Sequence, residues 1–131
     1  MGIVNVTPDS FYDGGRYFEA ERAREHARKL AEDGADILDV GGESSRPGAS
    51  GISVGEEIDR VCPIIEYAAR ELGIPVSVDT RRAKVAAEAI RSGATIINDI
   101  GALALDPDMA PLAARSGSTV VLMHMRGTPE T

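Results

Sequence analysis

The chain has 131 residues, of which 43% are hydrophobic, so it is long enough for one globular domain with a hydrophobic core. Its formal net charge of −7 comes from 14 basic and 21 acidic residues, and no run of Lys or Arg forms the basic patch that nucleic acid or an anionic membrane would require. A single cysteine and the lack of a long apolar stretch predict neither an internal disulfide nor a membrane span, and we expect a cytoplasmic protein.

Five short runs rich in branched aliphatic residues recur along the chain and predict buried β-strands. The runs are mostly apolar rather than strictly alternating, as expected for parallel strands in a sheet covered on both faces. The runs are Gly2 to Val6, Ala35 to Val40, Pro75 to Asp79, Ala94 to Ile100 and Thr119 to Met125.

The segments between these runs predict helices. Between the first two runs, residues 20–31 place small apolar side chains on one helical face and charged side chains on the others, and we expect this helix to end at Gly34. Ser53, with Glu56 three residues later, has the spacing of a capping box at the start of the second helix. Pro63 lies inside that helix, where we expect a kink.

Two further helices complete the alternation. Thr80 is predicted to cap the third helix, which ends at Gly93, and the fourth runs from about Pro107 to Arg115. This strict alternation of strand and helix is compatible with two α/β architectures, an open doubly wound sheet and a (β/α)₈ barrel of the TIM type.

Polar residues at the ends of the predicted strands favour the barrel. A barrel collects its active site from the carboxyl ends of many strands, whereas a doubly wound sheet concentrates its chemistry at one switch point. The residues at or near these ends are Asn5, Asp39, Asp79, Asn98, Asp99 and His124. Because a complete barrel needs on the order of 250 residues, we expect residues 1–131 to form the N-terminal part of one barrel domain, about its first four to five strand–helix units.

The first two strands are predicted to continue into long glycine-rich loops, in the stretches NVTPDSFYDGG and DVGGESSRPG. Loops of this length exceed the usual connections between strand and helix and are commonly functional lids. In the second loop, two glycines let backbone N–H groups approach an anion, Arg46 offers a forked cation and Ser45 adds a hydroxyl. Phe11 and Tyr12 lie in the first loop with little core to join, which indicates contact with a ligand.

Each of these residues, taken singly, also has a simpler structural explanation. Asp39 and Asp79 are compatible with turn formation at strand ends, and Arg46 with a solvated surface charge. His124 has no second His or Cys at ligand spacing, which favours a core residue over a metal ligand. The occurrence of polar groups at so many strand ends is what favours a site.

The same stretches, in their order and spacing, resemble the dihydropteroate synthase family of pterin-binding barrels. The resemblance covers Gly2 to Pro129 and rests on GIVNVTPDSFYDGG, ILDVGGESSRPGA, VSVDT, IINDI and LMHMRGTP. It implies an enzyme of folate biosynthesis that condenses 6-hydroxymethyl-7,8-dihydropterin pyrophosphate with 4-aminobenzoate and releases pyrophosphate, assisted by Mg²⁺. It also implies a sulfonamide target that binds small-molecule substrates, and a homodimer for the complete protein.

The resemblance further implies roles for individual residues at the strand ends. Asp79 and Asn98 would hydrogen-bond the pterin ring, and Ile100 and Met123 would line its pocket. Asn5 would lie at the site of Mg²⁺ and pyrophosphate.

The two loops would supply the remaining groups. Ser45, at a position where the family often has Thr, and Arg46 would face the pyrophosphate. Phe11 and Pro47 would form the aminobenzoate pocket once both loops close, and Asp13 would pair with Arg46 in that closed state. The predicted catalytic residues are therefore Arg46, Ser45 and Asp13.

The glycine-rich, lysine and Arg-x-His motifs that the family carries in its later strands do not occur in this sequence. We therefore expect activity only from a complete barrel. Two alternatives stay open: a relative that transfers a methyl group from a methylated folate to a corrinoid, and a non-catalytic pterin-binding half-barrel. The GGESSRPG loop argues against the methyltransferase, because a methyl transfer releases no pyrophosphate.

Overall fold

The computed structural model describes residues 2–6, 15–42, 53–99 and 106–122, in which strands and helices alternate. The strands are β1 (Gly2–Asn5), β2 (Leu38–Gly41), β3 (Val76–Asp79), β4 (Ile96–Asp99) and β5 (Thr119–Leu122). The helices are α1 (Gly15–Glu32), α2 (Val54–Tyr67), the π-helical η1 (Ala68–Leu72), α3 (Ala83–Ser92) and α4 (Met109–Ser116). Each predicted strand and helix is thus present, with bounds that differ by a few residues.

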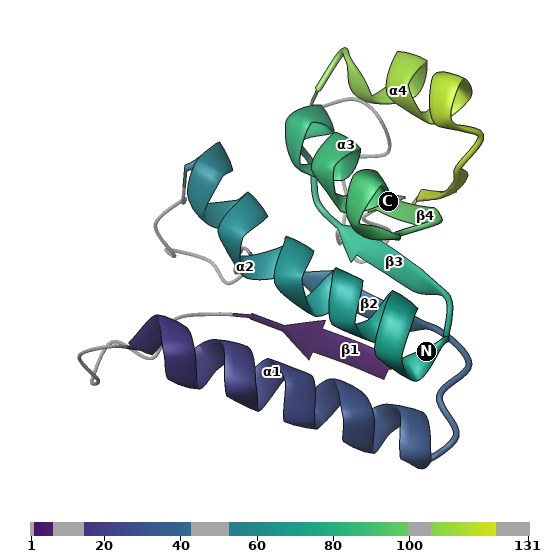
Figure 1. Ribbon diagram of the computed structural model, residues 1–131. Helices are drawn as coiled ribbons and strands as arrows, with labels where there is room; N and C mark the ends of the chain where they lie inside the picture. The colour runs from purple at the N-terminus through teal and green to yellow at the C-terminus, as the bar shows by residue number, and fades with distance from the viewer. Residues whose placement is uncertain (1, 7–14, 43–52, 100–105, 123–131) are drawn as a thin grey trace, which may run out of the picture.

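The five strands form one parallel sheet in the order β1-β2-β3-β4-β5. Because each strand pairs with the next one along the chain, always in the same direction, right-handed connections place the helices on one face of the sheet. Figure 1 shows α1 and α2 side by side along that face. A doubly wound sheet would reverse its strand order and carry helices on both faces, so the predicted barrel-type arrangement is confirmed.

The hydrophobic core lies between the sheet and the helices. Val4, Val40, Val78 and Ile97 occupy equivalent positions in neighbouring strands and are fully buried. The helix residues of this core recur with helical spacing: Ala23 and Ala27 on α1, Val61, Ile64 and Ile65 on α2, and Val85, Ala86 and Ala89 on α3. Since alternate strand residues face this core, the intervening ones point to the opposite face of the sheet.

The start of α2 agrees with its sequence signals. Ser53 caps the helix, and its Oγ accepts a hydrogen bond from the Glu56 N–H at 3.1 Å. Pro63 lies within α2, and shortly after it the chain changes to the wider turns of η1 from Ala68. The sequence pattern does not predict this change of helix type.

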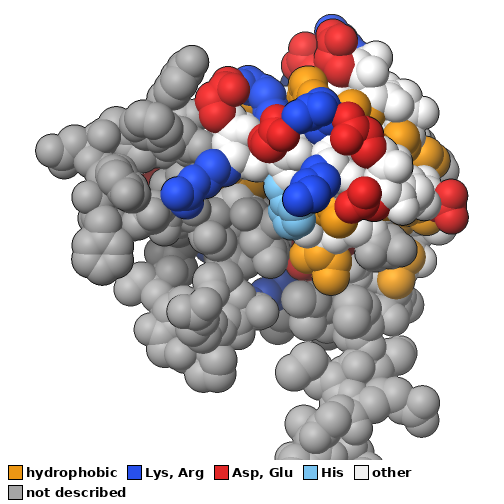
Figure 2. All heavy atoms as spheres, turned by 90° about the horizontal axis from the view of Figure 1, so that it is seen from below, with side chains coloured by type: hydrophobic (Ala, Val, Ile, Leu, Met, Phe, Trp, Pro, Cys, Tyr) orange, Lys and Arg blue, Asp and Glu red, His pale blue; other side chains and the backbone are white. Residues whose placement is uncertain are grey.

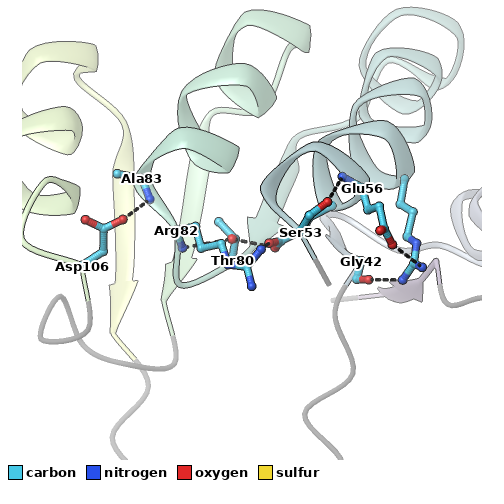
Figure 3. Close-up of polar contacts among 9 residues, drawn as sticks. Gly42, Ser53, Glu56, Thr80, Arg82, Ala83 and Asp106 are labelled. Atoms are coloured by element: carbon cyan, nitrogen blue, oxygen red, sulfur yellow. Dashed lines mark hydrogen bonds and ion pairs between the residues drawn. The ribbon is translucent and has the colours of Figure 1, made fainter. Parts of the chain in front are cut away.

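The predicted cap of α3 is wrong. Thr80 Oγ1 accepts a hydrogen bond from the Arg82 N–H at 3.1 Å, but the first N–H of α3, that of Ala83, donates to Asp106 Oδ2 at 2.7 Å (Figure 3). Asp106 Oδ1 also accepts a hydrogen bond from the Asp108 N–H at 3.0 Å, so this residue joins the start of α3 to the segment before α4. A local capping rule misses Asp106 because it lies 23 residues from Ala83.

Acidic and basic side chains are intermingled on the outer surface (Figure 2). On α1, Glu21 pairs with Arg24, and Arg28 lies between Glu25 and Glu32. Exposed pairs of this kind contribute only about 0 to 1 kcal/mol each, so this surface adds little to stability. Among the described residues, no helix combines the length and the apolar character that crossing a membrane demands.

Candidate functional site

Polar residues occupy the face of the sheet that is turned away from the helices. Asp39, Ser77 and Asn98 are at least nine-tenths buried there, and Asp79 at the end of β3 is partly buried. The register places Ser77 beside Asp39 and Asp79 beside Asn98, so these four side chains, here called the strand-end cluster, share one face. Ile3 lies on the same face, in register with Asp39, and is 56% exposed. The cluster therefore lies on the face that would form the inside of a closed barrel.

A buried hydrogen bond links β2 to β4 across β3. Asn98 Nδ2 donates to Asp39 Oδ2 at 3.1 Å. The remaining side-chain oxygens of this pair, Asn98 Oδ1 and Asp39 Oδ1, are buried and have no hydrogen-bond partner among the described residues. Leaving a buried polar atom without a partner costs about 1 to 3 kcal/mol, so such atoms in a native fold call for an explanation such as water, an ion or a ligand. The pair thus presents two acceptor oxygens to a bound group.

The two glycines after Val40 lie close to different parts of the structure. Gly41 lies in register with Asp79, and a Cβ at this position would lie 3.2 Å from Asp79 Cβ and 3.4 Å from Asp79 Oδ2. At Gly42 a Cβ would lie 3.0 Å from Val61 Cγ1, and the Gly42 carbonyl accepts a hydrogen bond from Arg60 at 3.0 Å (Figure 3). The first glycine leaves room for an acid of the cluster, and the second lets the chain pass close to α2.

The buried carboxyls of the cluster have raised pKa values. Burial first, and then the charges of Asp39 and Glu57, raise the pKa of Asp79 from 3.8 to about 6. Burial also raises the pKa of Asp39, against the opposing effect of the Ser77 hydroxyl and the Asn98 amide. The Ser77 hydroxyl lowers the pKa of Asp39, although its geometry is not that of a hydrogen bond. Carboxyls with raised pKa values that share one face of a sheet are candidates for a functional site.

A second polar group lies between the strand ends and α2, and the sequence reasoning missed it. Glu57 on α2 is 1% exposed, and its Oε2 accepts a hydrogen bond from Thr80 Oγ1 at 2.7 Å. Arg82 NH1 lies 3.5 Å from Glu57 Oε1. The signal in the sequence is an acid on the apolar stripe of α2, one turn before Val61 and two turns before Ile64.

The structure describes two predicted site residues completely, and it brings them together: Asp79 ends β3 and lies in register with Asn98, the penultimate residue of β4. Asn5 ends β1 at the same level, in register with Gly41, although its side chain lies outside the described residues. Asp99 follows Asn98 but is fully buried on the helix side of the sheet. The other predicted site residues lie outside the described part of the chain: Phe11, Asp13, Ser45, Arg46, Pro47, Ile100 and Met123, together with Tyr12 and His124.

The strand-end cluster is equipped for recognition rather than for bond breaking. It offers the oxygens of two carboxyls and one amide at neighbouring strand ends, which suits a planar ring with several N–H groups along one edge. The cluster itself contains no cation, so a charged leaving group would depend on other residues. Within residues 2–6, 15–42, 53–99 and 106–122, no group of three His, Cys, Asp or Glu side chains could hold a metal ion.

Comparisons with known proteins show to which family the chain is similar. The family model described as pterin binding enzyme matches residues 1–131. Dihydropteroate synthase of Bacillus subtilis is 55% identical over 126 residues, which are 96% of this chain and 44% of that protein. The chain therefore spans less than half the length of this relative.

Two solved structures show the same similarity. Dihydropteroate synthase of Xanthomonas albilineans with 4-aminobenzoic acid has a TM-score of 0.87 at 50% identity, over 97% of this chain and 46% of that one. The enzyme of Anaplasma phagocytophilum with bound 6-hydroxymethylpterin-monophosphate has a TM-score of 0.86 at 46% identity, over 98% of this chain and 49% of that one. These structural neighbours are dihydropteroate synthase barrels, about half of whose length the described fold represents.

Proposed function

The chain belongs to the family of pterin-binding enzymes, and from this membership we propose that it is the N-terminal part of a dihydropteroate synthase. Residues 1–131 would contribute the first strand–helix units of one barrel domain. The complete enzyme would condense 6-hydroxymethyl-7,8-dihydropterin pyrophosphate with 4-aminobenzoate. The chain alone would be inactive, because a sheet that does not close into a barrel leaves a bound substrate exposed to water.

The observation that supports this proposal most strongly is the pair of buried acceptor oxygens, Asn98 Oδ1 and Asp39 Oδ1, close to Asp79. A pterin ring presents an edge of adjacent N–H and acceptor groups, which carboxyl and amide side chains complement without a metal. Asp79, with a pKa of about 6, is mostly ionised at neutral pH and can accept two such N–H groups. The hydrogen bond from Asn98 Nδ2 to Asp39 fixes the Asn98 amide, so its single oxygen, Oδ1, has a defined direction.

In this proposal the two glycine-rich loops assist the bond breaking. The C–O bond between the pterin methylene and pyrophosphate breaks, and its electron pair leaves with the pyrophosphate, whose charge Arg46 and Ser45 would meet. The amine of 4-aminobenzoate forms the new C–N bond and releases one proton to the solvent. Phe11 and Pro47 would cover the aminobenzoate and exclude water, and Asp13 would pair with Arg46 when the loops close.

Mg²⁺ is part of the proposal through the family resemblance alone. The described residues contain no group of three His, Cys, Asp or Glu side chains that could hold a metal ion, but Mg²⁺ is usually bound through one or two protein side chains together with substrate phosphates. Asn5 would be a ligand, with pyrophosphate oxygens and water completing the shell that Mg²⁺ prefers. Ile100 and Met123 would line the ring pocket, and the complete enzyme would be a cytoplasmic homodimer and a sulfonamide target.

A chimera tests the proposed function. In it, this chain replaces the matched 126-residue segment of the Bacillus subtilis enzyme, and pyrophosphate release is measured with both substrates. We expect activity from the chimera and none from the 131-residue chain alone. The matched variant Arg46→Gln should still bind a free pterin but release pyrophosphate on the order of 100-fold more slowly.

Two outcomes would count against the proposal. A folded chimera that releases no pyrophosphate would contradict the assigned reaction. Normal turnover by the 131-residue chain alone would instead contradict the requirement for later strands.

A further inference from the structure

Thr80 directly follows Asp79 and is fixed from three sides. Its N–H donates to the Asn98 carbonyl at 3.2 Å, its Oγ1 accepts from the Arg82 N–H at 3.1 Å, and its hydroxyl donates to Glu57 Oε2 at 2.7 Å. The contact with Arg82 can be followed in Figure 3. Because Thr80 is only 4% exposed, little water competes for these hydrogen bonds. The peptide that joins Asp79 to Thr80 therefore has little freedom to move.

Glu57 is the unexpected member of this arrangement. It is 1% exposed and lies on the stripe of α2 that carries Val61, Ile64 and Ile65 into the core. Burying a carboxylate is costly, and replacing a buried ion pair by apolar residues of similar volume is often neutral or stabilising. Arg82 NH1, 3.5 Å from Oε1, offsets part of the charge. Stability alone therefore gives no reason for an acid at this position.

We propose that Glu57 is a positioning residue for the pterin-binding site: through Thr80 it fixes the end of β3 from which Asp79 reaches the substrate ring. That Asp79 binds the pterin ring rests on the proposed function. Glu57 acts from the helix side of the sheet, whereas Asp79 belongs to the opposite face. The same helix also holds the Gly42 carbonyl through Arg60, so α2 fixes the chain just beyond both β2 and β3.

Amide hydrogen exchange in the chimera tests the positioning role without a ligand. Glu57→Leu removes the acceptor for the Thr80 hydroxyl and keeps an apolar side chain in the core. We expect the Thr80 N–H to exchange on the order of tenfold faster, while the amides of Val40 and Val78 keep their rates. A merely structural role for Glu57 would accelerate all three amides alike.

Two variants of Thr80 separate the hydrogen bond from the packing. Thr80→Val removes the hydroxyl and keeps the shape, whereas Thr80→Ser keeps the hydroxyl. In the chimera, Glu57→Leu and Thr80→Val should each weaken the binding of 6-hydroxymethylpterin on the order of tenfold, and Thr80→Ser should bind within about threefold of the parent. Both changes break the hydrogen bond between Thr80 and Glu57, so the double variant should bind within about threefold of the weaker single variant. The KM for 4-aminobenzoate should stay unchanged.

The outcomes distinguish this inference from the proposed function. If the Thr80 N–H exchanges at the parent rate in Glu57→Leu, or if both variants bind the pterin with parent affinity, Glu57 does not position the site. A parent chimera without activity overturns the proposed function, and the exchange rates still decide whether Glu57 holds the end of β3. If Glu57→Leu does not fold, the exchange rate of the N–H at position 80 is compared between Thr80→Val and Thr80→Ser. Equal rates in these two variants would likewise show that the hydrogen bond to Glu57 does not hold the end of β3.

Discussion

Asp79 combines burial with charge, two properties that oppose each other. Its pKa of about 6 means that the carboxyl is mostly ionised at neutral pH in surroundings that disfavour the ion. A ligand that donates N–H groups to this carboxylate would relieve the unfavourable burial. In the free chain this buried charge is therefore expected to lower the free energy of unfolding. Functional sites often carry such destabilising groups.

The raised pKa of Asp79 predicts how stability depends on pH. Between about pH 4 and pH 6 the folded chain retains a proton on Asp79 that the unfolded chain has released, so the free energy of unfolding falls as the pH rises through this range. Above about pH 6 the carboxyl is ionised in both states and the destabilisation is complete. Asp79→Asn stays neutral and should be more stable than the parent at about pH 7.5, but equally stable near pH 4. Urea unfolding measures this difference, and a difference that does not vary with pH would contradict it.

Gly41→Ala should damage binding more than folding. The added Cβ would lie 3.2 Å from Asp79 Cβ, so the Asp79 side chain must move by a few tenths of an ångström. We expect the chimera to bind 6-hydroxymethylpterin on the order of tenfold more weakly, with a loss of roughly 1 kcal/mol in the free energy of unfolding. Gly55→Ala is the control, because its nearest neighbour, Ser53 Oγ, is 4.0 Å away. Parent affinity in Gly41→Ala would show that this glycine does not serve the site.

At the scale of elements, strands and helices follow from local pattern, but their side-chain contacts do not. The apolar runs and the glycines that follow the helices predict each element, since both signals are read within a few residues. The bonds of Ala83 to Asp106 and of Thr80 to Glu57 each join residues 23 positions apart. Such contacts depend on how the helices pack against the sheet, and local sequence patterns do not predict this packing.

The packing of α3 against η1 gives a prediction at this scale. Gly93 ends α3 with φ 126°, and a Cβ there would lie 2.7 Å from Ala69 Cβ. Gly93→Ala should lower the free energy of unfolding by roughly 2 to 5 kcal/mol, through backbone strain and overpacking together. Gly117 also has a positive φ, 69°, but open space around it, so Gly117→Ala should cost only about 1 to 2 kcal/mol. Equal losses in thermal or urea unfolding would contradict the close packing.

At the scale of the whole molecule, the strand order creates the site. Sequential parallel pairing places the helices on one face and leaves Asp39, Asp79 and Asn98 together on the other. The sequence predicts this gathering, because the carboxyl ends of parallel strands meet at one edge. It does not predict the hydrogen bond between Asn98 and Asp39, which depends on the strand register. The proposed roles of Arg46, Ser45 and the other loop residues stay predictions.

The most direct test of the strand-end cluster as a pterin site is calorimetric titration of the chimera with 6-hydroxymethylpterin. Asp79→Ala and Asn98→Ala each remove one member of the cluster, and Asp59→Ala removes an exposed acid from α2 as the control. We predict that the first two lower the affinity on the order of 10- to 100-fold, because a hydrogen bond to a charged group contributes about 1.5 to 3 kcal/mol and a buried partner is left unmatched. The control should bind like the parent. Undiminished affinity in a folded Asp79→Ala or Asn98→Ala chimera would show that the ring is not held at the ends of β3 and β4.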